Sequence, residues 1–208
     1  FARAEPRREI VFFGVGFETT APLTAALVAQ AQGQGVPNLS VLCVHKTMPE
    51  AIRALMRDGA RVDALLCPGH VAAVAGAEAF RFVPEELLLP AAVSGFEAGE
   101  MLLALAALMG MLQTGKPGLV NAYPRAVTPY GNQTALALLE SVFEPCGAAW
   151  RGLGNIPASG LALRGEYAFF DAEKRFDIPA PDVPDPAGCR CADVLRGLLE
   201  PPECPLFG

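Results

Sequence analysis

The sequence predicts an α/β fold: an open, mainly parallel sheet flanked by helices, followed by a small irregular cysteine-rich module. Over residues 1–118, apolar strand-like segments alternate with helical segments of ten or more residues, which is the pattern of parallel βαβ units. Hydrophobic residues make up 52% of the 208 residues, which is enough for a packed core. Three of the six cysteines lie in the final stretch, 189–208, and indicate a separate module there.

Four strands are expected in the first part of the chain. The first, "EIVFFGVG" (9–16), is almost entirely apolar, so we expect it to be buried on both faces. The other three expected strands are residues 38–45, 62–70 and 89–96. Helices are expected between and after them at residues 22–35, 49–59, 98–115 and 132–143, with Pro22 in the first turn of the first helix and glycines closing several helices.

The second part of the chain is expected to be less regular. Residues 148–163, "AAWRGLGNIPASGLAL", are rich in glycine and hold the only tryptophan. One short amphipathic helix is expected at 166–176, followed by an extended, proline-rich linker at 177–188. We therefore predict an α/β domain over 1–145 and, over 146–208, an irregular segment, the linker and part of a metal-binding module.

Composition excludes several classes of function. A formal net charge of -6 argues against sequence-independent binding of nucleic acid, which depends on Lys and Arg contacts to phosphate. The longest apolar run, 101–112, is shorter than the roughly 20 residues that a membrane-spanning helix needs. The chain opens without a secretory leader, so the sequence gives no indication of export. Separately, Cys43 and Cys67 lie in strand-like runs, so we expect packed free thiols in a reducing compartment. Cys146 receives no role.

Polar residues follow each expected strand. Because parallel strands present their carboxyl ends at one edge of a sheet, where ligands usually bind, we expect these residues to meet at a single edge. The candidate residues are Glu18, Thr19, Thr20, His45, His70 and Glu97. Each also has a structural interpretation, because carboxylates and threonines are common at the first turn of a helix. A dinucleotide fingerprint is excluded, since Thr19 stands where G-x-G-x-x-G requires its last glycine.

The terminal cysteines have the spacing of a metal site. Cys189, Cys191 and Cys204 form a C-x-C-x12-C pattern with a short helical stretch between the second and third thiols. Tetrahedral zinc and a 4Fe-4S cluster each take four ligands, and thiolates suit both metals. Spacing alone leaves zinc, iron–sulfur and a reduced thiol pair open. We expect a fourth ligand beyond residue 208.

Six segments, in this order, resemble the HypD family of NiFe-hydrogenase maturation factors. They are "VFFGVGFETTAP", "CPGHVAAVAG", "AAVSGFEAGEML", "NAYPRAVTPYGN", "WRGLGNIPASGLAL" and "CRCADVLRGLLEPPECPLFG". The resemblance runs through nearly the whole chain and corresponds to the family's central and C-terminal portions. It implies a cytoplasmic assembly scaffold, not a conventional enzyme, made of related α/β domains and a small 4Fe-4S domain.

The resemblance also implies partners and site residues. On such a scaffold, with the chaperone HypC, the Fe(CN)2(CO) group of the hydrogenase is assembled, with cyanide arriving from HypE, before delivery to the large subunit. Cys189, Cys191 and Cys204 match the first three cluster cysteines, Glu18 with both threonines matches the GFETT segment, and His70 matches the histidine of PGHVS. The chain departs from the family at Ala72, where serine is usual, and at Glu100, where aspartate is usual. The family's N-terminal CGGH and C-P-x-C motifs do not occur here.

Two other functions remain open from the residues alone. One is a zinc-stapled α/β domain that binds a small ligand at the strand edge, and the other is a thiol redox protein that uses the terminal cysteines. Visible absorbance near 400 nm (roughly, for Cys-ligated iron–sulfur centres) would favour the scaffold with its cluster, whereas a colourless protein with stoichiometric zinc would favour the first alternative.

Overall fold

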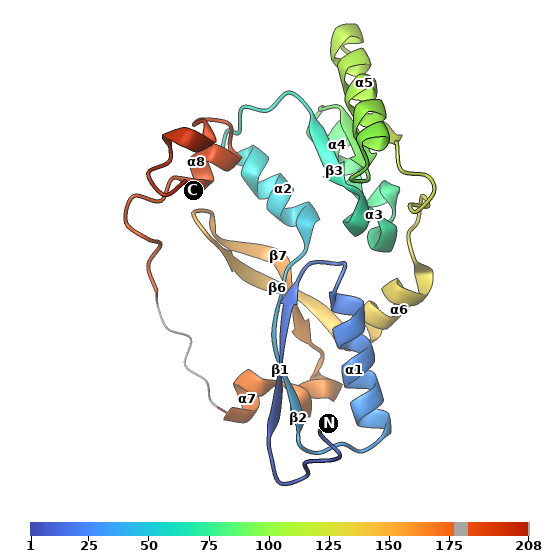
Figure 1. Ribbon diagram of the computed structural model, residues 1–208, viewed down its shortest axis with the longest axis vertical. Coiled ribbons are helices and arrows are strands. Elements are labelled where there is room, and N and C mark those ends of the chain that lie inside the picture. The colour runs from blue at the N-terminus through green and yellow to red at the C-terminus, as the bar shows by residue number, and fades with distance from the viewer. Residues whose placement is uncertain (177–182, 208) are drawn as a thin grey trace. The chain divides into compact units, whose positions relative to one another are not determined.

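The computed structural model describes residues 1–176 and 183–207, which form two compact units. The first unit comprises the described residues within 1–50, 134–150 and 154–185, and the second those within 51–133, 151–153 and 186–208 (Figure 1). The domain boundary expected after residue 145 stays a prediction. Half of the linker expected at 177–188, residues 177–182, lies outside the described residues.

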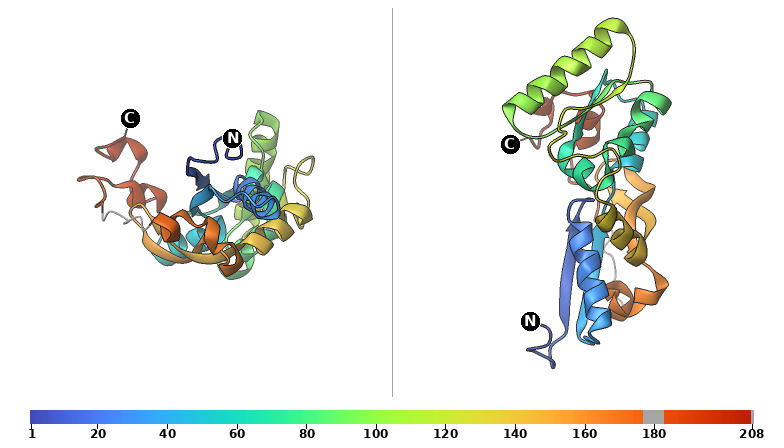
Figure 2. Two further views of the ribbon diagram at one scale, coloured as in Figure 1. Left: turned by 90° about the horizontal axis from the view of Figure 1, so that it is seen from below. Right: turned by 90° about the vertical axis from the view of Figure 1, so that its right-hand side faces the viewer.

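The first unit is built around a pair of parallel strands. β1 (Ile10–Gly16) pairs along its whole length with β2 (Leu39–His45). Between them the chain forms α1 (Ala21–Gly33), whose buried face packs toward the two strands (Figures 1 and 2). The core of this unit consists of Ala25, Val28, Ala31, Val36, Leu39, Val41, Val142, Phe143, Leu163, Tyr167 and Phe170.

β1 is exposed, which contradicts the expectation of a strand buried on both faces. Val11, Phe12, Phe13 and Val15 are between 43% and 58% exposed. β1 pairs only with β2 in the described part of the chain, so it is an edge strand. Its apolar composition follows the pattern of a central strand. Burial, however, also requires neighbouring elements that cover both faces of the strand. The pattern of a single segment does not predict whether such neighbours are present.

A long antiparallel hairpin replaces the irregular segment expected around residues 148–163. α6 (Gln133–Val142) leads directly into β6 (Phe143–Trp150), which pairs with β7 (Gly154–Leu163). Gly152 and Gly154 adopt φ values of 70° and 72°, conformations that glycine adopts without steric cost and that reverse the chain here. The many glycines therefore mark a turn and a bulged strand.

The expected strands are divided between two sheets instead of sharing one edge. The edge of β2 away from β1 is bridged by Lys46 to Gly160 and by Val41 to Asp171. Residues from far along the chain thus occupy the edge of β2 to which a further parallel strand would otherwise bind. The third and fourth expected strands pair with each other in a separate sheet.

The helix expected at 166–176 is broken in two. A 3-10 helix, η2 (Gly165–Phe170), precedes the short α7 (Ala172–Phe176). Asp171 between them has extended backbone, and its Oδ1 accepts a hydrogen bond from the amide of Glu173 at 3.1 Å. This is the geometry of an aspartate that caps a new helix, and it explains the break.

The second unit contains a three-stranded parallel sheet with the order β3 (Leu65–Pro68), β4 (Ala91–Ser94) and β5 (Leu119–Asn121). The expected strand at 62–70 is therefore shorter, because the chain turns into a helix at Gly69. The helices around these strands are α2 (Met48–Arg57, whose first residues belong to the first unit), α3 (Gly69–Ala75), η1 (Ala77–Phe80), α4 (Phe82–Glu86) and α5 (Ala98–Thr114). The α/β class with parallel sheets flanked by helices is confirmed.

α5 is the longest described helix and buries only a narrow stripe. Ala104 and Leu108 pack with Ala92 of β4 in a small core, whereas Leu102, Leu103 and other apolar residues of the helix are exposed. Gly115 ends the helix with a left-handed φ of 63°. Among the described helices, none has both the length and the apolar character required to cross a bilayer.

The cysteine module is compact and is joined to the rest of the second unit. It contains α8 (Cys191–Leu195) and the 3-10 helix η3 (Pro201–Glu203). The guanidinium of Arg196 forms a 2.7 Å ion pair with Asp58, and its carbonyl accepts a hydrogen bond from the amide of Arg61. The small irregular cysteine-rich module expected from the sequence is therefore present.

Candidate functional site

Glu18 is buried at the carboxyl end of the β1–β2 pair. Its side chain follows Gly16 and Phe17, and only 7% of the residue is exposed. Oε1 accepts a hydrogen bond from the amide of Met48 at the start of α2 (2.8 Å), while Oε2 has no hydrogen-bond partner among the described residues. Burial raises the pKa of this carboxyl, against a smaller lowering by the Met48 amide. The protonated, neutral form of Glu18 is therefore more favoured than that of an exposed glutamate.

His45 ends β2 and is almost fully buried, with 2% exposure. Its Nε2 lies 2.8 Å from the hydroxyl of Thr24 on α1, and Gly14 of β1 leaves room for the ring, because a Cβ there would lie 3.1 Å from Nε2. Burial lowers the pKa of His45, so the neutral imidazole is favoured. Through Nε2 this buried histidine ties α1 to the end of β2, while its Nδ1 is buried without a hydrogen-bond partner among the described residues.

A strained bulge borders the same edge. Within the β6–β7 hairpin the register shifts between Cys146 and Ala148, and Ala158 takes a φ of 54°, which is unfavourable for a residue with a Cβ. The carbonyl of Ser159 accepts a hydrogen bond from the amide of Thr47, and its hydroxyl accepts one from Trp150 Nε1 at 2.8 Å. Bulges of this kind recur beside functional sites, where they direct side chains.

Lys46 and two aromatic rings complete this edge. The amine of Lys46 donates a hydrogen bond to the carbonyl of Ala149 at 2.5 Å and lies 4.8 Å from the centre of the Trp150 ring. The ring of Phe17 lies 6.0 Å from that of Trp150. The first unit therefore gathers a buried acid, a buried histidine, a lysine and two aromatic rings at one end of its sheet.

Thr19 and Thr20 are both exposed near this edge. Thr20 occupies the position that caps α1, but its hydroxyl makes no hydrogen bond to the helix amides. Instead it donates to the carbonyls of Val15 and Phe17, at 3.3 and 3.4 Å. Gly16 is required here, since a Cβ at its φ of 132° would lie 2.2 Å from the Thr20 hydroxyl oxygen.

The carboxyl end of the second sheet carries His70. This histidine is exposed at the start of α3, and its ring lies 4.8 Å from that of Phe96. The preceding Gly69 packs so closely that a Cβ would meet the carbonyl oxygen of Ser94 at 2.3 Å. The absence of a side chain at Gly69 therefore permits β3 and β4 to end side by side.

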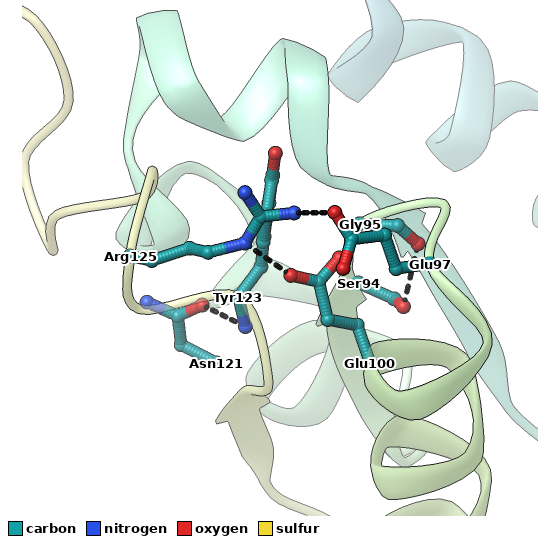
Figure 3. A network of polar contacts seen from close by, with 7 residues as sticks. All are labelled: Ser94, Gly95, Glu97, Glu100, Asn121, Tyr123 and Arg125. Atoms are coloured by element: carbon teal, nitrogen blue, oxygen red, sulfur yellow. Dashed lines mark hydrogen bonds and ion pairs between the residues drawn. The ribbon is translucent and has the colours of Figure 1, made fainter.

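Figure 3 shows that Arg125 joins two carboxylates at this second edge. Its guanidinium contacts Glu97 at 2.7 Å and Glu100 at 2.5 Å, and it lies 5.0 Å from the ring of Tyr123. Glu97 precedes the first residue of α5, and Glu100 lies in its first turn, where negative charge is favoured by the helix dipole. The carboxylate of Glu100 thus reaches an arginine.

The three terminal thiols line one cavity. Cys189, Cys191 and Cys204 border a cavity of about 260 Å³ together with Arg151 and the apolar side chains of Val194, Leu195, Pro201, Leu206 and Phe207. All three cysteines are free thiols and are partly buried. Among the described residues, no three or more His, Cys, Asp or Glu side chains are grouped tightly enough to hold a single metal ion.

The remaining cysteines lie elsewhere. Cys67 is 2% exposed in β3, and burial raises the pKa of its thiol to about 12. Cys43 donates a hydrogen bond to the carbonyl of Leu161 at 3.1 Å, and burial raises the pKa of its thiol to about 11. Such thiols are protonated at neutral pH and unreactive, which suits packing.

The structure therefore gathers the predicted site residues in groups. Glu18, Thr20 and His45 lie at the end of the first sheet, His70 and Glu97 at the end of the second. The sequence interpretation missed Arg125, Trp150 and Ser159 as members of these edges. β5 was not predicted, and recognising "LVN" before Arg125 as a parallel strand would have placed this arginine at the same edge as Glu97.

Comparison with known proteins gives consistent results. A family profile described as "HypD: Hydrogenase formation hypA family" matches residues 1–208. Hydrogenase maturation factor HypD of Rhodobacter capsulatus is 40% identical over 213 residues, covering 100% of this chain and 56% of that protein. HypD of Rhizobium leguminosarum bv. viciae is 39% identical with coverage of 100% and 56%. A putative hydrogenase expression/formation protein of Methanocaldococcus jannaschii is 36% identical with coverage of 100% and 58%.

These matches cover the whole chain, although the chain spans little more than half the length of the curated relatives, 56% of the R. capsulatus protein. They run through both strand edges and the cysteine module. The chain belongs to the HypD family.

Proposed function

We propose that this protein acts in hydrogenase maturation as part of a scaffold on which, together with a HypC-like chaperone, the Fe(CN)2(CO) group is assembled. The relatives are named as hydrogenase maturation factors, and the chain matches them from end to end. The observation that carries the proposal is that Cys189, Cys191 and Cys204 line one cavity, and these are the residues that the sequence resemblance matches to the family's cluster cysteines.

We propose an iron–sulfur cluster as the resident centre, because the resemblance to the family implies one and thiolates suit it. Tetrahedral zinc also takes four ligands, so the metal content decides between the two. In a 4Fe-4S cluster each thiolate binds a different iron, so the ligands surround a larger volume. Three thiols around a cavity of about 260 Å³ are suitable donors for such a cluster. The fourth ligand would come from a residue other than these three.

The chain's own residues would hold and shield this centre. The three thiols lose their protons and bind iron, while Val194, Leu195 and Phe207 provide an apolar wall that limits access of water and affects the potential. When bound, the cluster supplies or accepts single electrons. The iron group under assembly is cargo of the scaffold and is distinct from this resident centre.

We assign the two strand edges to the assembly task. At the first edge Glu18 and His45 are buried and hold its backbone in place. At the second, His70, Phe96, Glu97 and Arg125 are exposed and offer aromatic and charged surface to a partner. The proposed partners are the HypC-like chaperone, a HypE-like cyanide donor and, indirectly, the hydrogenase large subunit, within the cytoplasm.

Anaerobic reconstitution tests the proposal. The protein is incubated with ferrous iron and sulfide, and iron, acid-labile sulfide and zinc are counted per chain. We expect bound iron and sulfide with broad absorbance near 400 nm (roughly, as for Cys-ligated clusters). Cys191→Ser should abolish cluster binding, because it removes a ligand, whereas Cys67→Ser should alter only packing and stability.

The same samples are then passed over an immobilised HypC-like chaperone. Retention of the protein that contains iron supports the scaffold function. Stoichiometric zinc without iron would instead favour the zinc-stapled alternative, and absence of both iron and chaperone binding would refute the proposal.

A further inference from the structure

The cavity of the three thiols is lined by one arginine, and the sequence interpretation gave this residue no role. Arg151 follows β6 and, with Gly152 and Leu153, belongs to the second unit. Gly152 lies against α8, since a Cβ at this position would be 2.8 Å from that of Ala192. Its positive φ of 70° also restricts the position to glycine. The turn therefore packs against the helix that begins at Cys191.

This packing brings a guanidinium to the cavity. Arg151 borders the same cavity of about 260 Å³ as Cys189, Cys191 and Cys204. Most of the other lining side chains are apolar. Arg151 is itself exposed, and near a protein surface a charge still acts over a longer distance than in bulk water, because the effective dielectric constant is about 20 instead of about 80.

Two neighbouring arginines form ion pairs with carboxylates, whereas Arg151 does not among the described residues. Arg190, between two of the cysteines, is paired with Asp193 at 2.5 Å, and Arg196 is paired with Asp58 at 2.7 Å. For Arg151, the described part of the chain shows no ion pair with a carboxylate. A full positive charge is therefore available at the cavity wall.

We propose that Arg151 sets the reduction potential of the cluster held by the three cysteines, and keeps it higher than the thiolates alone would. The inference rests on the proposed function, and it adds to that function a residue whose charge acts on the cluster. Reduction adds one electron from an external reductant to the cluster and breaks no bond, so the cluster becomes more negative by one charge. A guanidinium beside it stabilises the reduced form, and net charge is one of the factors that set such potentials.

The test measures the potential and not the activity. Arg151→Gln removes the charge, Arg151→Lys keeps it, and Arg7→Gln removes an exposed charge of the first unit as a control for net charge. Each reconstituted protein is titrated anaerobically with dithionite and redox mediators, and the reduced cluster is quantified by electron paramagnetic resonance. Iron and sulfide are counted in parallel.

We expect the ratio of reduced to oxidised cluster at a fixed potential to fall about tenfold in Arg151→Gln. For an assumed separation of roughly 10 Å and an effective dielectric constant of about 20, one unit charge changes such a ratio by about 10- to 20-fold. Arg151→Lys should stay within about twofold of the wild type, because a flexible ammonium retains the charge. Arg7→Gln should match the wild type.

Four results would overturn the inference. An unchanged ratio in Arg151→Gln, with full iron content, refutes the role of the charge while leaving the proposed function intact. An equal fall in Arg151→Lys shows that the guanidinium acts through shape. Loss of iron in Arg151→Gln alone assigns the residue to the fold of the module. If the wild-type protein binds no iron, the proposed function itself fails, and this inference fails with it.

Discussion

Glu18 shows how a single carboxyl group couples the strand edge to the stability of the first unit. Its Oε1 accepts the Met48 amide, yet its Oε2 is buried without a partner among the described residues. Burial raises the pKa of this group above its usual value of 4.5. The folded state therefore binds the proton more tightly than the unfolded state does, and folding is favoured most when the carboxyl is neutral.

This pKa shift predicts a pH dependence of stability. A raised acid pKa adds to the free energy of unfolding at pH values below the pKa of the unfolded state. This contribution is lost as the pH rises through the pKa of the folded state. In Glu18→Gln this loss should disappear, because the amide carries no charge at any pH and its oxygen can still accept the Met48 amide. Urea unfolding at pH 4 and pH 7.5 should show a smaller decrease in the free energy of unfolding for Glu18→Gln than for the wild type.

The exposed Glu97 provides the control for this comparison. Glu97→Gln removes a carboxylate from a surface ion pair, and such pairs contribute little to stability. Its pH dependence should follow that of the wild type. A Glu18→Gln variant that loses as much stability between the two pH values as the wild type would show that the buried carboxyl does not titrate as inferred.

At the level of single residues, the sequence identified several members of the site but not their environments. The positions of Glu18, His45 and Glu97 after strands could be inferred from the alternating pattern. Whether a side chain is buried or exposed depends on distant segments, as His45 shows by packing near Phe143. Arg125 was missed because β5 has only three residues, too short for a periodic signal.

Two glycines of the second unit illustrate opposite constraints within elements. Gly69 ends β3 and begins α3, where a Cβ would meet the Ser94 carbonyl at 2.3 Å and the Tyr123 ring at 2.6 Å. Gly110 lies inside α5, where a Cβ would have no neighbour within 4 Å. The first glycine is required by close approach of two backbones, and the second is not.

Alanine substitutions should therefore change stability in opposite directions. Gly69→Ala should lower the free energy of unfolding by about 2–4 kcal/mol, since backbone atoms must move to accept the methyl group. Gly110→Ala should raise it by about 0.5–1 kcal/mol, because alanine is the better helix former. Thermal unfolding followed by circular dichroism measures both. A neutral Gly69→Ala would show that β3 and β4 do not end as closely as described.

The elements that sequence pattern located best are those with strong local signals. The helices with proline or glycine at their ends were placed within a few residues, as for α1 and α5. The β6–β7 hairpin was missed, because glycine and proline interrupt its alternation and its register shift removes the regular period. The helix expected at 166–176 failed at Asp171, whose capping role competes with helix continuation.

On the scale of the whole molecule, the described residues leave a large apolar area uncovered. Val11, Phe13 and Val15 alternate along one face of β1 and are each at least 46% exposed. α5 adds exposed residues such as Leu102 and Leu103. Contiguous apolar surface on an edge strand favours association with other chains, and this chain spans little more than half of its relatives' length, 56% of the R. capsulatus protein.

We therefore predict that the protein self-associates through these surfaces when it is studied alone. Phe13→Lys places a charge on the exposed edge strand and should lower the associated fraction at micromolar concentration, because charges on edge strands oppose pairing. Sedimentation velocity measures the fraction, and circular dichroism verifies the fold. A matched substitution at Thr19, exposed but outside the strand, should leave association unchanged. Equal association of Phe13→Lys and the wild type would exclude β1 as the contact.

The single tryptophan gives the first sheet edge an intrinsic optical reporter. Trp150 donates its indole hydrogen to Ser159 inside the bulge and lies beside Lys46, so its emission responds to the polarity around that edge. No dye or label is needed to follow events there. Binding of a partner at this end of β1 and β2 would shift the fluorescence of one identified side chain, and titrations could be read without ambiguity about their origin.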